Sequence, residues 1–213
     1  MIGLPPGVAE VALFAAFVGF IGVVTRGVRR RRVFTPAETG DVPDLRTDQR
    51  VSATVRRVWR DAQQNVWLVE ASLGKRRFSF CATDYAENGE RYAALVGKNA
   101  DFAWFALSTL APGGAEAMQN QIKDADKVDL STNPVRLVRA GQFANDYVVI
   151  GRILSRRDET VDDVPVTVYR TQVVRSDDLT LVLELAAERA DDKRFADQSM
   201  VHGSARLFGY LAT

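Results

Sequence analysis

Hydrophobic and polar residues alternate along much of the chain after residue 50, and this alternation predicts β-strands. The first alternating segment places Val51, Ala53 and Val55 on one face of a period-two ladder. Residues 65–73 and 77–82 continue the alternation, with a short turn containing Gly-Lys-Arg between them. The order predicts an antiparallel meander of three strands.

A helix and a fourth strand are predicted to follow the meander. Residues 85–97 have helical spacing and end at a glycine, whereas residues 101–111 are apolar on both faces and are typical of a buried strand. The same order recurs between residues 146 and 212, with three alternating segments, a polar stretch and a last strand. This pattern leaves two arrangements open: two tandem small β-barrels resembling the oligonucleotide/oligosaccharide-binding (OB) type, and one larger sheet with an inserted helix.

The start of the chain has a different pattern. Residues 4–25 hold a single charged residue, Glu10, and a helix of this length spans about 33 Å, enough for the hydrocarbon core of a bilayer. Basic residues follow this run rather than precede it, which indicates a membrane anchor and not a cleaved export signal. The residues expected to contact anionic lipid headgroups are Arg26, Arg29, Arg30, Arg31 and Arg32.

The predicted fold class is therefore an N-terminal single transmembrane helix followed by a mainly β (β-rich α+β) cytoplasmic region. Its predicted divisions are a transmembrane anchor at 1–28, a basic juxtamembrane segment and tether at 29–50, a first β module at 51–110, a connector with a short helix at 111–145, and a second β module at 146–213. The predicted location is a single-pass membrane protein with its N-terminus outside. The heavy use of arginine over lysine indicates a bacterial inner membrane.

Composition limits the chemistry that the chain can perform. With 28 basic and 27 acidic residues, no whole-chain charge attracts nucleic acid or an acidic substrate. The single cysteine, Cys81, excludes an internal disulfide, and neither Cys81 nor the single histidine, His202, has the spacing of a metal ligand or nucleophile. No phosphate-cradling or nucleophile-elbow motif occurs. We therefore expect no enzyme activity, no cofactor and no metal.

Two sets of residues are candidates for binding. The first lies on the strand that is apolar on both faces and would dock a protein partner: Phe102, Trp104 and Phe105. The second interleaves arginine with tryptophan, as in sheets that bind single-stranded nucleic acid: Arg56, Arg57, Trp59, Arg76 and Arg77. The alternation places Trp67, Phe78 and Phe80 on the core face, and residues 51–110 hold only 8 basic against 6 acidic groups. Core packing is therefore favoured for these aromatic residues, which argues against nucleic acid as a partner.

The function expected from these observations is a membrane-anchored, non-enzymatic interaction or scaffold protein, or an accessory subunit. Its partners would be anionic headgroups of the lipid bilayer together with a membrane-protein complex or further copies of the chain. The alternative is a membrane-tethered OB-like protein that binds single-stranded nucleic acid or oligosaccharide. Salt-sensitive binding of single-stranded DNA would favour the alternative.

Overall fold

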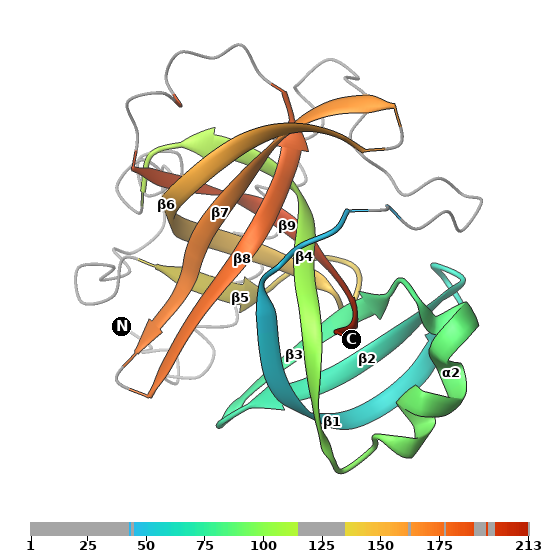
Figure 1. Ribbon diagram of the computed structural model, residues 1–213. Helices are drawn as coiled ribbons and strands as arrows, with labels where there is room; N and C mark the ends of the chain where they lie inside the picture. The colour runs from blue at the N-terminus through green and yellow to red at the C-terminus, as the bar shows by residue number, and fades with distance from the viewer. Residues whose placement is uncertain are drawn as a thin grey trace, which may run out of the picture.

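The computed structural model describes Pro43 and residues 45–114, 135–161, 163–176, 178–189, 195 and 199–212. Within these residues, nine strands belong to one continuous sheet, and one helix lies beside it (Figure 1). In chain order the elements are β1 (Arg50–Asp61), β2 (Val66–Leu73), β3 (Arg76–Ala82), α2 (Tyr85–Ala94), β4 (Asn99–Pro112), β5 (Arg136–Arg139), β6 (Asp146–Val161), β7 (Val164–Ser176), β8 (Leu179–Glu188) and β9 (Met200–Leu211).

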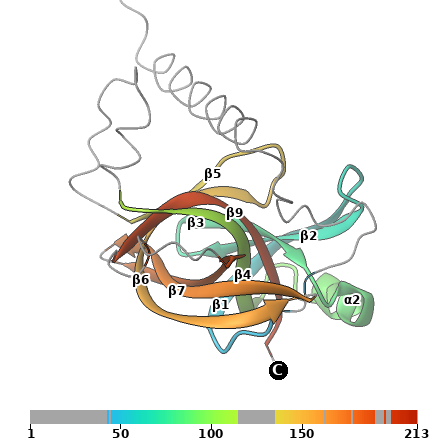
Figure 2. The same ribbon diagram turned by 90° about the horizontal axis from the view of Figure 1, so that it is seen from above.

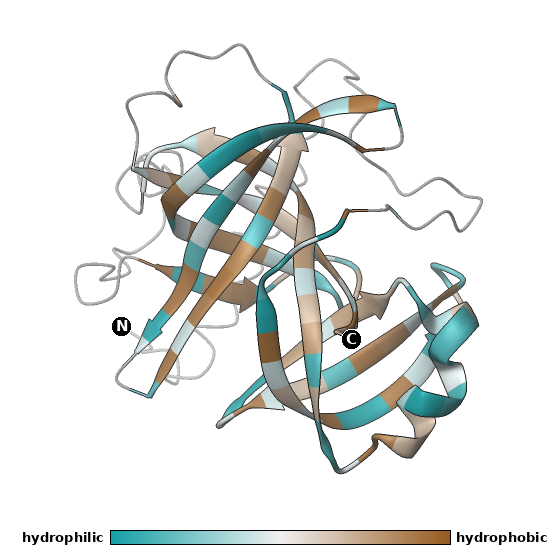
Figure 3. Cartoon of the chain, in the orientation of Figure 1, coloured by the Kyte–Doolittle hydropathy of each residue, from teal (hydrophilic) through white to brown (hydrophobic). Residues whose placement is uncertain are grey.

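The strands of both meanders, together with β4 and β9, lie where the sequence predicts them, whereas β5 lies in the segment 111–145, for which the sequence predicts a connector with a short helix. In β1, the side chains of Val51, Ala53 and Val55 are buried whereas Ser52 between them is exposed. Polar and apolar bands also follow one another along strands of both rings (Figure 3). The turn between β2 and β3 contains Gly74 with φ of 56°, a left-handed conformation that glycine adopts without a steric penalty. Local pattern and turn chemistry therefore account for the first meander.

Five strands close a first ring. Its order is β1-β2-β3-β9-β4, and β4 pairs back onto β1 in antiparallel orientation, from Arg50 opposite Ala103 to Thr54 opposite Asn99. The link between β3 and β9 is parallel and places Cys81 opposite Phe208. Figure 1 shows this ring at the lower right, with α2 beside it. The ring uses the first half of β4 and the last part of β9.

A second ring follows the same plan with the other halves of the two long strands. Its order is β6-β7-β8-β4-β9, and β9 pairs back onto β6 between Met200 and Arg206. The link between β8 and β4 is parallel, from Phe105 to Ser108 on β4. Figure 2 looks down on strands of this ring, which curve around a common centre, while β5 adds to the outside of β6.

The strands β4 and β9 belong to both rings. They pair in antiparallel orientation from Phe102 opposite Leu211 to Pro112 opposite Val201, and the middle pair is Ala106 opposite Leu207. An approximate two-fold axis through this pair relates the two rings. The first meander pairs with the first half of β4 and runs parallel to the second half of β9, whereas the second meander pairs with the first half of β9 and runs parallel to the second half of β4. Each ring has the strand order of an OB barrel, in which the fifth strand is parallel to the third.

This sharing contradicts the two tandem barrels, one of the two arrangements that the sequence leaves open for the fold class, because all nine strands belong to one sheet. Neither meander closes a ring with its own fourth strand alone, because the parallel fifth strand comes from the other half of the chain. Each meander supplies three strands, and β4 and β9 complete both rings because each of them belongs to both. Whether 51–110 and 146–213 behave as separable units stays a prediction.

The predicted transmembrane helix is a second correction. Residues 4–25 and the arginines from Arg26 to Arg32 lie outside the described residues, and in the part that is described no helix is long and apolar enough to cross a membrane. The helix α2 has ten residues, about 15 Å in length, which is half of a bilayer's hydrocarbon core. This finding contradicts the predicted single-pass fold class and the predicted membrane localisation. The mainly β character agrees with the structure.

The interior of the first ring is filled by aromatic side chains. Phe80, Phe102 and Trp104 are fully buried, and the ring centroids of Phe80 and Trp104 lie 5.3 Å apart. Gly209 on β9 makes room for the indole, because a Cβ atom at this position would lie 2.6 Å from Cδ1 of Trp104. The apolar cluster continues from this ring into the second through Ala106 and Leu207. The two interiors therefore form one core.

A second apolar cluster lies on the other side of the shared strands. It contains Leu68 and Cys81 from the first meander, Phe105 and Phe208 from the shared strands, and residues of β7 and β8, and Leu45 packs onto it from the segment before β1. Because β4 is covered on both faces by these two clusters, its residues from Phe102 to Leu107 are all buried.

Candidate functional site

The exposed outer side of β1, β2 and β3 holds most of the predicted arginine and tryptophan set. A β-bulge in β1 falls between Val55 and Arg57, so Arg56 is left out of the ladder. Without the bulge, strict alternation would turn the side chain of Arg57 toward the core. With the bulge, Arg56 and Arg57 are both exposed and the next inward position is taken by Val58, which packs against the core.

The two arginines are held by different contacts. Nε of Arg56 donates a hydrogen bond of 2.8 Å to Oγ of Ser72, a buried serine on β2. The guanidinium of Arg57 lies over the indole of Trp59, 4.9 Å from the ring centroid, which is a cation–π arrangement. Trp59 itself is half-buried and packs against the outer apolar cluster. Arg57 and Trp59 thus form a stacked unit whose outer layer is a guanidinium plane.

A third arginine, Arg77 on β3, faces the same side. Its guanidinium lies 3.5 Å from the carboxylate of Glu70 on β2, and its side chain is 71% exposed. An ion pair as exposed as this one contributes little to stability and leaves the cation accessible. We call the surface formed by Arg56, Arg57, Trp59, Glu70, Ser72 and Arg77 the arginine face.

Arg76, the remaining member of the predicted set, does not join the arginine face. It occupies the first position of β3 and pairs with Leu73 across the turn. The pKa of Asp178 is lowered by a hydrogen bond from Ser176, and to a smaller degree by Arg76 and Lys75, so these cations lie toward the turn between β7 and β8. The structure therefore brings together four of the five predicted residues.

The predicted protein-docking residues occupy a different environment. Phe102, Trp104 and Phe105 are all 0% exposed. The first two fill the interior of the first ring, and the ring of Phe105 stacks on Phe208 at 5.6 Å in the outer cluster. Their apolar character on both faces of one strand reflects the sharing of β4 between two rings. In the folded chain they do not offer a surface to a partner.

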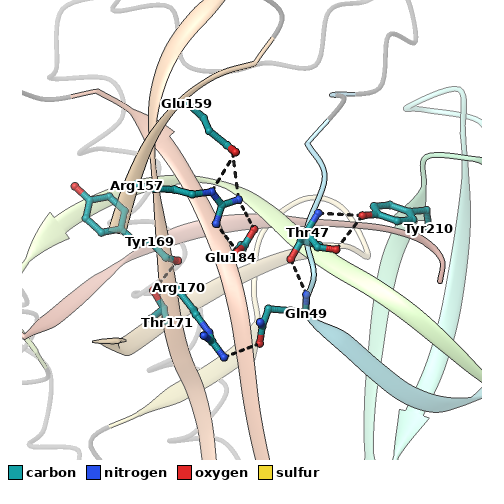
Figure 4. A network of polar contacts seen from close by, with 9 residues as sticks. All are labelled: Thr47, Gln49, Arg157, Glu159, Tyr169, Arg170, Thr171, Glu184 and Tyr210. Carbon is teal, nitrogen blue, oxygen red and sulfur yellow. Dashed lines mark hydrogen bonds and ion pairs between the residues drawn. The ribbon is translucent and has the colours of Figure 1, made fainter. Parts of the chain in front are cut away.

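The second ring has an ion pair on the corresponding face (Figure 4). Arg157 on β6 binds the buried carboxylate of Glu184 on β8 through two nitrogens, and the distance between Nη2 and Oε2 is 2.8 Å. Nε of Arg157 lies 3.1 Å from the carboxylate of Glu159. These carboxylates raise the pKa of Arg157, chiefly through the hydrogen bonds that Arg157 donates to Glu184. The cation is therefore engaged within the protein.

The segment before β1 covers part of this second face. The backbone amide of Thr47 donates to the hydroxyl of Tyr210 at 3.0 Å, and the same hydroxyl donates to the carbonyl of Thr47 at 3.1 Å. Nη2 of Arg170 donates to Oε1 of Gln49 at 3.4 Å (Figure 4). Residues 45–49 thus connect the first ring to the second.

The two residues considered for catalysis in the sequence are both buried. Burial raises the pKa of the Cys81 thiol to about 12, so the thiol stays protonated at neutral pH and is a poor nucleophile. Nδ1 of His202 lies 3.0 Å from the carbonyl oxygen of Gly113. Among the described residues, no group of three or more histidine, cysteine, aspartate or glutamate side chains is arranged to hold a metal ion.

Sequence reasoning missed Glu70 and Ser72 as members of the arginine face. The signal was present, because the alternation that buries Val69 and Ala71 turns Glu70 and Ser72 to the opposite side of β2. Their partners on β1 depend on the bulge, which no local pattern revealed.

No known family, curated protein or solved structure matches this chain.

Proposed function

We propose that this chain is a non-enzymatic binding protein and that the arginine face binds single-stranded nucleic acid. The observation that carries the proposal is the stacked unit of Arg57 on Trp59, flanked by Arg56 and Arg77 on one exposed surface. Proteins of this class combine cations that hold phosphates with planar groups on which bases stack. All three cations and the planar group come from one meander.

Each residue of the face has a defined role in this proposal. Arg56 and Arg77 bind phosphate oxygens, and the edge of the Arg57 guanidinium binds a third phosphate, because a guanidinium donates paired hydrogen bonds to such groups. A base stacks on the guanidinium plane of Arg57, which Trp59 supports from below. Glu70 opposes the phosphates, and it orients Arg77 in the absence of ligand.

The strand order of the ring supports the same proposal by analogy. In OB barrels the outer side of strands two and three is a ligand surface, and the arginine face lies over β2 and β3 with the adjoining part of β1. A likeness of topology raises the expectation without assigning a function. The charged and stacked residues at this location are the stronger support.

The test is a titration of the full chain with a fluorescent single-stranded DNA or RNA of about 12 nucleotides, a length within the range of OB sites. Contacts with three phosphates predict that log K falls with log salt with a slope of about −2, so affinity drops about twentyfold between about 50 and 200 mM salt. Arg57→Gln should weaken binding and reduce the slope, whereas Arg156→Gln, an exposed arginine on β6, should change neither.

A second control separates the arginine face from the arginine block near the start of the chain. Replacing Arg29, Arg30, Arg31 and Arg32 together by glutamine removes a block of positive charge that would bind any polyanion. The effect of Arg57→Gln should persist in this background. Loss of all binding in the background, or binding that ignores Arg57→Gln, overturns the proposal. Capture of an acidic protein by the same face, without nucleic-acid binding, overturns it in favour of a protein partner.

A further inference from the structure

We infer that Arg139 on β5 completes the arginine face, so that the nucleic-acid strand is held by residues of both rings. This inference rests on the proposed function of the arginine face. Arg139 is far from the other members in the sequence and belongs to the strand that pairs with β6. It is exposed, and it reaches across to the first ring.

The contact that places Arg139 is a hydrogen bond to β3. Nη2 of Arg139 donates to Oγ of Ser79 at 2.6 Å, and Nε donates to the carbonyl oxygen of Ala144 at 2.8 Å. Ser79 lies two positions after Arg77 on β3, so both side chains point to the same side of the strand. Arg139 is therefore next to Arg77 on the outer surface, on the side away from β1.

The backbone around Ser79 is also tied to the second ring. The amide of Ser79 donates to the hydroxyl of Tyr147 at 2.6 Å, and that hydroxyl donates to the Ser79 carbonyl at 3.2 Å. β3 pairs with β9 only at Cys81 and Ala82, so Tyr147 satisfies backbone groups that the ladder leaves open. Arg139 and Arg77 are held in a fixed relation by this junction.

The charge of Arg139 is not neutralised by a carboxylate, whereas the charge of Arg157 in the second ring is. Ser79 and Glu184 occupy equivalent positions in the two rings. Each lies two residues before an equivalent residue of the parallel link, which is Cys81 in the first ring and Ala186 in the second. Glu184 is a carboxylate and neutralises Arg157, whereas Ser79 offers Arg139 a hydroxyl. Among the described residues, no ion pair includes Arg139. A neutral anchor therefore orients a guanidinium whose charge stays available for a phosphate.

The resulting row of cations crosses the sheet. Arg57 lies on β1 and Arg77 on β3, two strand spacings or about 10 Å away, and Arg139 extends the row beyond β3. A single strand laid across β1, β2 and β3 would meet these cations in succession. The inference adds one phosphate contact to those of the first ring.

The experiment compares variants of the full chain in the same salt titration. Arg139→Gln should lower the affinity about threefold to tenfold at low salt and reduce the salt slope by about 0.7, the contribution of one phosphate on a single strand. Arg139→Lys keeps the charge but not both hydrogen bonds, so its slope should stay near that of the natural chain while its affinity falls. Arg156→Gln is the matched control.

A second variant tests the argument from the equivalent position. Ser79→Glu places a carboxylate beside Arg139, as Glu184 is placed beside Arg157, and should reduce the slope as much as Arg139→Gln does. Combining the two changes should reduce it further, because the carboxylate then repels the strand without a partner. Since Ser79 is 1% exposed, Ser79→Ala serves as the variant that tests whether the fold tolerates a change there, judged by its melting temperature.

The outcomes separate this inference from the proposed function. If the natural chain binds and Arg57→Gln reduces the slope, but Arg139→Gln behaves as Arg156→Gln does, the inference is overturned and the proposed function stands. If the natural chain does not bind, both are overturned. A lower affinity of Arg139→Gln with an unchanged slope indicates a purely structural role for Arg139 and also overturns the inference.

Discussion

The outer faces of the two rings have the same backbone plan and opposite charge patterns. Trp59 in the first ring and Arg157 in the second occupy equivalent positions. Each lies two residues after the point where pairing resumes beyond the bulge, and they pair with Leu68 and Val168 respectively. In the first ring this position is an aromatic residue beneath an exposed guanidinium. In the second it is an arginine bound by Glu184 and Glu159.

The two faces differ in their side chains on a common backbone. At the bulge, Arg56 of the first ring corresponds to Leu154 of the second, and both are exposed. The first ring thus presents cations whose partners are hydroxyls or weak surface pairs, whereas the second ring neutralises its central cation with a buried carboxylate. The proposed binding of nucleic acid therefore rests on the side chains of the first face and not on the fold.

The largest expected effect concerns the shared core. Trp104→Ala removes a fully buried indole from the first ring, and we expect the free energy of unfolding to fall by about 3–5 kcal/mol. Because β4 and β9 belong to both rings, urea should unfold the two rings in one transition at a lower midpoint. Circular dichroism and tryptophan fluorescence, followed together, measure this. Two separate transitions, with only one shifted, would support independent modules instead.

A smaller effect is expected from the ion pairs that distinguish the two faces. Glu184→Gln removes the charge that neutralises Arg157 and should lower the free energy of unfolding by about 1–2 kcal/mol, less than for a fully buried pair because Arg157 is 40% exposed. Glu70→Gln is the matched control in the first ring and should change it by less than about 0.5 kcal/mol. Equal effects in thermal melts would contradict the distinction between the two faces.

The effect that is smallest at neutral pH concerns Cys81, whose equivalent in the second ring is Ala186. Burial raises the pKa of this thiol from 9.0 to about 12. The folded chain therefore holds the thiol proton more tightly than the unfolded chain does, so this contribution to stability is complete below pH 9 and is lost as the pH rises toward 12. The natural chain should lose more stability over this range than Cys81→Ala does. An identical pH dependence of the two chains in urea titrations would contradict the assignment.

Local pattern predicted the secondary structure better than it predicted exposure. Period-two alternation identified the strands of both meanders and placed Phe78 and Phe80 in the core, where they are 3% and 0% exposed. The same reasoning failed for Trp104 and Phe105, because a strand that is apolar on both faces does not reveal what covers it. Alternation alone also gives no reason for Arg56 and Arg57 to be exposed on the same face, since this depends on a bulge that shifts the register by one residue and reverses the facing of every residue that follows.

The sequence by itself determined the strands of the two meanders, their turns and the order in which they occur, because these depend on the side-chain period and on residues such as Gly74 that are adjacent in the chain. It did not reveal β5, which lies in the segment predicted as a connector. Only the tertiary structure decided that β4 and β9 are shared by two rings, that Arg139 meets Ser79, and that Arg157 meets Glu184. These contacts join residues 60 and 27 positions apart. They arise when the core closes, and the pattern along a single strand carries no information about which distant strand will lie beside it.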